Sequence, residues 1–164
     1  MITCKRKVEN GTIRFYNENN QLHHEDGPAI ERTNGSREWY LNGLCHREDG
    51  PAIEYADGSR FWYLNGKLHR VDGPAVEFAS GTRMWYLNGQ RHREGGPAIE
   101  DADGDRMWCL NGKFHRVDGP AIEWADGNVE WWLHGVKYPP TGPIMLKYNE
   151  QKKALDMAEL STRL

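Results

Sequence analysis

The sequence predicts an all-β protein, an elongated antiparallel array of β-hairpin repeats with one C-terminal α-helix. Three observations predict it: a 23-residue period, two hairpin-turn signals in each period, and a helix-favouring composition confined to the C-terminal end. The repeats occupy residues 11–143, after an N-terminal segment of residues 1–10 and before the helix at residues 149–164. Hydrophobic residues make up only 38% of the chain, so the array is expected to bury aromatic side chains on thin sheets.

Two residue types mark the period. A histidine series that begins at His23 and a tryptophan series each recur every 23 residues through five units, and Tyr16 falls on the tryptophan count one unit earlier. Such regularity is typical of repeat proteins in which similar units stack and terminal units that depart from the consensus act as caps. We interpret the following as structural repeat positions: Trp39, Trp62, Trp85, Trp108, Trp131, His46, His69, His92 and His115.

Each unit begins with a strand and a turn. In one representative unit, residues 52–56 are a short β-prone run that ends at Asp57-Gly58, a dipeptide favoured in hairpin turns. The register there has two solutions: a two-residue loop pairs Ile53 with Trp62, and a three-residue loop pairs Glu54 with Trp62. The choice between them decides which side chains share a face of the sheet.

The second half of the unit returns and turns again. Residues 60–64 form the return strand, and Asn65-Gly66 is a second hairpin signal that places His69 opposite Trp62. Residues 67–69 add a third short strand. A Gly-Pro step then ends each unit, because proline cannot donate to a β-ladder and keeps the preceding residue extended.

The predicted helix lies in a segment of different composition. Residues 149–160 contain no glycine or proline and are rich in helix formers, with Asn149 as the expected N-cap. Its apolar stripe has two interpretations: it covers the last open strand edge, or it docks onto another protein or a second copy of the chain. The stripe consists of Ala154, Leu155, Met157, Ala158, Leu160 and Leu164.

Charge and hydropathy exclude several classes of partner. The net charge of −3 provides no basic excess for nucleic acid. No apolar run approaches the roughly 20 residues of a membrane span, and the N-terminus lacks the apolar stretch of a signal peptide. The three cysteines, Cys4, Cys45 and Cys109, are an odd number without metal-type spacing, so we expect them to be reduced. These features predict a cytoplasmic protein, with membrane association disfavoured.

The histidine series does not predict a metal site. With two strands per unit, equivalent residues of neighbouring units lie about 9 to 10 Å apart. Zinc ligands approach to about 3 to 4 Å of one another, so histidines of neighbouring units cannot share one ion. We therefore expect neither a metal nor a cofactor, and we interpret the histidines as stacking and hydrogen-bonding groups.

No residue stands out as catalytic. A glutamate column and an arginine column on adjacent strands predict cross-strand ion pairs rather than one distinct pair of catalytic carboxylates. No serine lies in a nucleophile elbow, and the cysteines lack a defined base partner. The columns are Glu31, Glu54, Glu77, Glu100 and Glu123, and Arg37, Arg60, Arg83 and Arg106.

Positions that differ between units are the candidates for function. Glu38, Phe61, Met84, Met107 and Glu130 share one variable column. A basic row beside the histidines has two interpretations: its arginines lie over the aromatic rings, or they meet an acidic patch on a partner. The candidate partner-binding residues are Arg47, Arg70, Arg93, Arg116, Lys152, Lys153, Leu155 and Met157.

The motif W-Y-L-N-G-K-x-H followed by D-G resembles MORN repeats over residues 11–143. It departs from them where arginine follows the histidine, and there it is similar to the H-R-E-D-G-P-A repeats of small proteins of tailed phages. The MORN resemblance implies a scaffold for proteins or for anionic lipids. The phage resemblance, in size and repeat style, is to inhibitors of the host ATP-dependent protease Lon, and it implies action in the host cytoplasm.

Taken together, these features predict a non-enzymatic protein-binding repeat module. The resemblance makes a host ATP-dependent protease such as Lon the specific partner expected, with a homodimer as a further form of association. The alternatives are a MORN-like scaffold on anionic lipid surfaces and a small hydrolase that uses the glutamate and histidine of a single unit.

Overall fold

The computed structural model describes residues 4–139, and all of its regular elements there are β-strands. The predicted all-β array of antiparallel hairpins is confirmed, whereas the predicted helix at 149–164 lies outside the described residues. The strands are β1 (Lys5–Glu9), β2 (Thr12–Tyr16), β3 (Ile30–Glu31), β4 (Arg37–Glu38), β5 (Tyr40–Leu41), β6 (Leu44–Cys45), β7 (Ile53–Glu54), β8 (Arg60–Phe61), β9 (Tyr63–Leu64), β10 (Lys67–Leu68), β11 (Val76–Glu77), β12 (Arg83–Met84), β13 (Tyr86–Leu87), β14 (Gln90–Arg91), β15 (Ile99–Glu100), β16 (Arg106–Met107), β17 (Cys109–Leu110), β18 (Lys113–Phe114), β19 (Ile122–Glu123), β20 (Val129–Leu133) and β21 (Val136–Tyr138).

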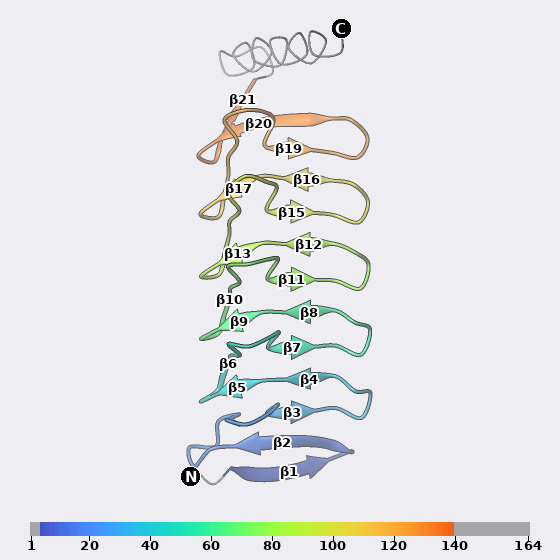
Figure 1. Cartoon of the computed structure of the whole chain (residues 1–164), viewed down its shortest axis with the longest axis vertical. Coiled ribbons are helices and arrows are strands. Elements are labelled where there is room, and N and C mark those ends of the chain that lie inside the picture. The colour runs from blue at the N-terminus through green and yellow to red at the C-terminus, as the bar shows by residue number, and fades with distance from the viewer. Residues whose placement is uncertain (1–3, 140–164) are drawn as a thin grey trace, which may run out of the picture.

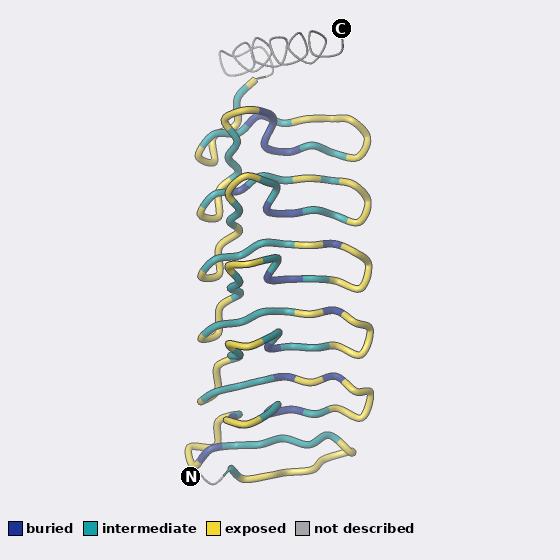
Figure 2. The backbone as a smooth tube through the Cα atoms, in the orientation of Figure 1, coloured by how far each residue is buried: buried dark blue, intermediate teal, exposed yellow. Residues whose placement is uncertain are grey.

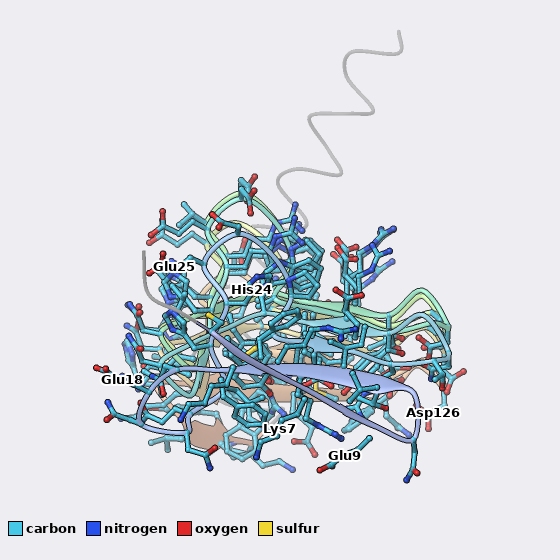
Figure 3. The ribbon with its side chains drawn as sticks, turned by 90° about the horizontal axis from the view of Figure 1, so that it is seen from below. Lys7, Glu9, Glu18, His24, Glu25 and Asp126 are labelled. Carbon is cyan, nitrogen blue, oxygen red and sulfur yellow. The ribbon has the colours of Figure 1, made fainter. Side chains whose placement is uncertain are left out.

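The units stack along one long axis. Each adds two strands to a 13-stranded sheet in the order β1-β2-β3-β4-β7-β8-β11-β12-β15-β16-β19-β20-β21, and the hairpins β5-β6, β9-β10, β13-β14 and β17-β18 lie beside it. Figure 1 shows the turns of successive units aligned on either side of the array. In the end-on view of Figure 3 the units lie behind one another, with the β1 residues Lys7 and Glu9 at the near end.

The first turn of each unit has a register that neither sequence-based solution predicted. Ile53 pairs with Phe61 and Glu54 with Arg60, so both predicted partners of Trp62 are wrong. The Tyr55 N–H donates to the carbonyl of residue 59 at 2.9 Å, which leaves a three-residue loop ending at Gly58 with φ of 94°. Glycine therefore closes the loop in the left-handed conformation instead of occupying the second position of a two-residue turn.

The predicted return strand 60–64 is two strands, which is a second correction. It is interrupted at Trp62, whose N–H donates to the Ala75 carbonyl of the next unit at 2.8 Å. The half before Trp62 belongs to the long sheet, and the half after it pairs with β10 around Asn65-Gly66. Both residues of that turn have positive φ, 51° and 76°, so the predicted two-residue loop is confirmed.

The first unit is offset by one residue. Phe15 takes the place of Trp39, since its N–H donates to the carbonyl of the next buried alanine, as the Trp39 N–H does. His24 stacks on Phe15 with ring centroids 4.3 Å apart, where Arg47 covers Trp39 in the next unit. Tyr16 therefore does not replace tryptophan, although the 23-residue count placed it there. The turn at 17–21 is one residue longer than its counterparts and absorbs the difference.

The core is one layer thick. Its centre is a column of alanines without any exposed surface, and Figure 2 shows buried segments at the inner ends of the long hairpins, with shorter ones near the outer turns. Trp131 is the one aromatic residue among the buried apolar residues of the described chain, and the other tryptophans of the series are half-buried, so the prediction that aromatic side chains supply the burial stays a prediction. The buried apolar residues are Ala29, Ile30, Ala52, Ala75, Val76, Ala98, Ile99, Cys109, Ala121, Ile122 and Trp131.

Candidate functional site

The long sheet has two faces of different composition, and cross-strand pairing assigns residues to each. On one face, which we call the constant face, glutamate and arginine alternate from strand to strand. On the other, the variable face, an aliphatic residue alternates with a residue that changes from unit to unit. The constant row is Glu31, Arg37, Glu54, Arg60, Glu77, Arg83, Glu100, Arg106 and Glu123. The variable row is Ile30, Glu38, Ile53, Phe61, Val76, Met84, Ile99, Met107, Ile122 and Glu130.

The basic row lies on the constant face and is bonded internally. The guanidinium carbon of Arg70 is 4.0 Å from the Trp62 ring centroid, and its Nε donates to Asp72 at 3.0 Å. Its Nη1 donates to the Pro74 carbonyl at 3.2 Å and to Glu77 at 3.3 Å. The Arg70 hydrogen bond holds the pKa of Asp72 below its ordinary value. Arg47, Arg93 and Arg116 cover Trp39, Trp85 and Trp108 in the same way.

The predicted cross-strand ion pairs between the glutamate and arginine columns are wrong. The carboxylate of Glu77 is bound by Arg70, which lies before it in the chain, across the loop that contains Gly73-Pro74. Arg60 and Arg83, which pair with Glu77 on the neighbouring strands, form no ion pair within residues 4–139. The folded-back arginine reaches the carboxylate because Gly73 lets it pass: a Cβ there would lie 2.9 Å from the Arg70 guanidinium carbon.

The histidines join consecutive units. The His69 N–H donates to the Trp62 carbonyl at 3.0 Å, which confirms that these residues lie opposite each other. Its Nδ1 accepts the backbone N–H of Asn88 in the next turn at 3.2 Å. The same bond recurs from Asn42 to His23, Asn65 to His46, Asn111 to His92 and His134 to His115. Each histidine thus ties its own hairpin to the turn of the following unit.

Exposed aromatic residues gather on the variable face. The Phe61 ring meets those of Tyr55 and Phe78 edge-on, at centroid separations of 5.5 and 5.4 Å. Tyr55 and Phe78 remain 42% and 39% exposed, although both belong to this cluster. Contiguous exposed apolar surface of this kind is typical of protein-binding sites. We call these three residues the aromatic cluster.

Charged side chains at the two ends of the variable face are neutralised internally. The nearly buried carboxylate of Glu38 is paired with Arg32 and accepts the Tyr40 hydroxyl at 3.1 Å. Towards the other end, Glu130 accepts Lys137 at 2.7 Å and the Trp132 indole at 2.8 Å, and these bonds lower its pKa. The aromatic cluster therefore lies between Glu38 and Glu130, whose carboxylates are already hydrogen-bonded within the chain.

Cys45 and Cys109 have thiols that resist deprotonation. Burial, followed by the charge of Glu38, raises the pKa of Cys45 to about 12, and burial raises that of Cys109 to about 11. Both thiols are therefore protonated near neutral pH. Residues 4–139 contain no group of three or more side chains able to hold a metal ion. They also contain no helix with the length and apolarity to cross a membrane.

The predicted partner-binding residues divide into two sets. The four arginines of the basic row lie over tryptophan rings as one interpretation expected, and their part in partner binding stays a prediction. The second set, Lys152, Lys153, Leu155 and Met157, lies outside the described residues. The aromatic cluster was only partly anticipated: the variable column singled out Phe61, but without the correct register Tyr55 and Phe78 could not be assigned to the same face.

No protein-family model and no curated protein matches this chain. The constant face repeats its contacts in unit after unit, and the variable face is where the units differ.

Proposed function

We propose that this chain is a non-enzymatic protein-binding repeat module whose partner binds the variable face. The observation that supports the proposal is the aromatic cluster, in which Tyr55 and Phe78 flank Phe61 and stay exposed. Aromatic residues and methionine are enriched at protein interfaces, and Met84 and Met107 continue the same row.

The architecture suits a protein partner better than a small ligand. Two strands per unit lengthen the variable face by about 9 to 10 Å at each repeat, so a partner has an extended, nearly planar surface to contact. Each partner in a standard interface buries about 800 Å². A surface of that size requires several adjacent units, and the repeat supplies them without any new folding problem, because each unit contacts only its neighbours.

The specific partner we propose is a host ATP-dependent protease such as Lon, with the chain acting as a phage-encoded inhibitor in the host cytoplasm. This identity comes from the resemblance of the H-R-E-D-G-P-A repeats. What supports an inhibitory role is the extended variable face with its exposed aromatic cluster, which would cover an entrance or a moving part of the protease.

The test measures ATP-dependent degradation of a fluorescent unfolded substrate by purified Lon in the presence of the full chain. We expect inhibition, and we expect F61S with F78S to raise the inhibitor concentration for half inhibition by at least about tenfold, since an aromatic anchor typically contributes more than about 1 kcal/mol. The matched control is V71S, which removes an apolar side chain 83% exposed and outside the variable row.

Two results would overturn parts of the proposal. Absence of both inhibition and binding at micromolar concentration would exclude Lon. Capture of another protein equally by the native chain and by the F61S/F78S variant would exclude the variable face. Sedimentation of the chain alone tests whether the variable face binds a second copy of the chain. In that case the native chain would sediment as a dimer and the F61S/F78S variant as a monomer.

A further inference from the structure

One turn in the described array breaks the repeat with a titratable residue. In four units the second turn carries asparagine in the left-handed conformation, and in the last described unit it carries His134 at φ of 52°. The side chain of His134 lies against His115, with ring centroids 4.2 Å apart and planes at 45°. The matching asparagines are Asn42, Asn65, Asn88 and Asn111. Two imidazoles therefore meet at the interface between the last two described units.

The hydrogen bond at this interface requires a neutral ring. The backbone N–H of His134 lies 3.1 Å from Nδ1 of His115, and because an amide N–H only donates, that nitrogen must carry a lone pair. The His115 ring is then neutral with its proton on Nε2. Protonation of Nδ1 would place two donors against each other and break the bond.

Three of the other four interfaces offer a protonated histidine an acceptor that this interface does not. At His46, His69 and His92 the side-chain oxygen of the following asparagine lies 2.9 to 3.1 Å from the same Nδ1. A protonated ring there could donate to that oxygen in place of the lost bond. His134 offers an imidazole in place of the amide oxygen, so protonation of His115 finds no such acceptor on the turn that it contacts.

Among residues 4–139, no carboxylate beside His115 replaces the missing acceptor. Glu48 and Glu94 lie 3.7 and 4.0 Å from Nε2 of His46 and His92, whereas the equivalent residue beside His115 is Val117. Asp118 is bound by Arg116 at 3.1 Å. Burial, followed by the charge of His134, lowers the pKa of His115. The charged residues that line the same surface pocket as His115 are Arg93, Glu94, Arg116 and Asp118. Lys113 contacts the His134-Gly135 turn.

We propose that the His115–His134 pair is an acid-sensitive latch that holds the last described unit, residues 120–139, to the rest of the array. Above the ordinary histidine pKa of about 6.5 the His115 ring is neutral and the bond is intact. As the pH falls below that value and through the lower folded-state pKa of His115, the His115 ring gains a second proton and the bond breaks. The stabilisation is therefore present at neutral pH and is lost on acidification.

The test is hydrogen exchange and nitrogen NMR of the full chain between pH 7.5 and 5.0. At pH 7.5 the His115 ring should carry its proton on Nε2, which long-range nitrogen–proton correlations distinguish from the other tautomer. On acidification the protection factor of the His134 amide should fall at least about tenfold more than that of the equivalent Asn111 amide, because only the His134 amide loses its acceptor without a replacement contact for the protonated ring.

The matched variant is H134N, which restores the asparagine of the other turns and keeps the backbone donor. It should fold, retain the Nε2–H tautomer of His115 and lose the excess acid sensitivity. A proton on Nδ1 of His115 at pH 7.5 would overturn the proposal. So would equal loss of protection at Asn111 and His134, or an acid response in H134N as large as in the native chain.

Discussion

Arg70 lies over Trp62, with its guanidinium carbon 4.0 Å from the ring centroid, and its Nη1 donates to the carboxylate of Glu77 in the following hairpin. One side chain thus covers the aromatic ring of its own unit and binds Glu77 of the next. Because the same arrangement recurs at Arg47, Arg93 and Arg116, the constant face is tied together unit by unit.

Replacement of Arg70 by alanine should destabilise the chain by about 1–3 kcal/mol, since it removes a cation–π contact, the hydrogen bonds of a charged group and the packing of the side-chain stem. Urea unfolding followed by tryptophan fluorescence measures the effect. R60A is the matched control: Arg60 is exposed and forms no ion pair within residues 4–139, so its loss should change stability by less than about 0.5 kcal/mol. Equal effects of the two variants would contradict the assigned role.

Gly73 should be coupled energetically to Arg70. A Cβ at residue 73 would lie 2.9 Å from the guanidinium carbon, so G73A should displace the arginine and destabilise the chain by about 1 kcal/mol. In an R70A background the clash disappears, and G73A should then be nearly neutral. A double-mutant cycle by urea unfolding measures the coupling, and additive effects would show that Gly73 serves another purpose.

His69 should contribute to stability and not to catalysis. H69F keeps a ring of similar size but removes the acceptor for the Asn88 N–H, and because Asn88 is exposed to water the loss should be about 1 kcal/mol. Calorimetry should show a lower Tm. An unchanged Tm together with loss of a hydrolytic activity would instead support the hydrolase alternative.

The Cys45 thiol should be unreactive at neutral pH, because burial and the charge of Glu38 raise its pKa to about 12. Its alkylation by iodoacetamide at pH 8 should be at least about tenfold slower than in the unfolded chain. E38Q should accelerate the reaction at Cys45, since the charge that opposes the thiolate is gone, and should leave Cys109 unchanged. Equal acceleration at both thiols would indicate general loosening of the sheet.

The same thiol predicts a loss of stability in alkali. Its folded-state pKa lies above the value of about 8.5 in an unfolded chain, so the stabilisation is fully present below pH 8.5. It is lost progressively as the pH rises from there towards the folded-state value of about 12. C45A should reduce this alkaline dependence of the unfolding free energy, which urea titrations between pH 8 and 10.5 would measure.

The period, the strand content and the Asn-Gly turns followed from the sequence because they depend on residues close together in the chain. Asn65-Gly66 needs only two adjacent residues that tolerate positive φ, and the confirmed pairing of Leu64 with Lys67 follows from it. The predicted register at Asp57-Gly58 is wrong because the three-residue loop consists of residues 56–58 and not of residues 57–59. A change of one residue in register moves every side chain of a strand to the opposite face.

The sequence by itself determined that this protein is a stack of antiparallel hairpins in which tryptophan, histidine and Gly-Pro mark equivalent places. Only the tertiary structure decided that Glu77 is bound by Arg70 and not by the cross-strand Arg83, and that Phe15 replaces tryptophan in the first unit. It also placed Tyr55, Phe61 and Phe78 together on one exposed face. Hairpin propensity is local, whereas the face of a side chain and the partner of a charge depend on the register between strands and on loops that fold back across it.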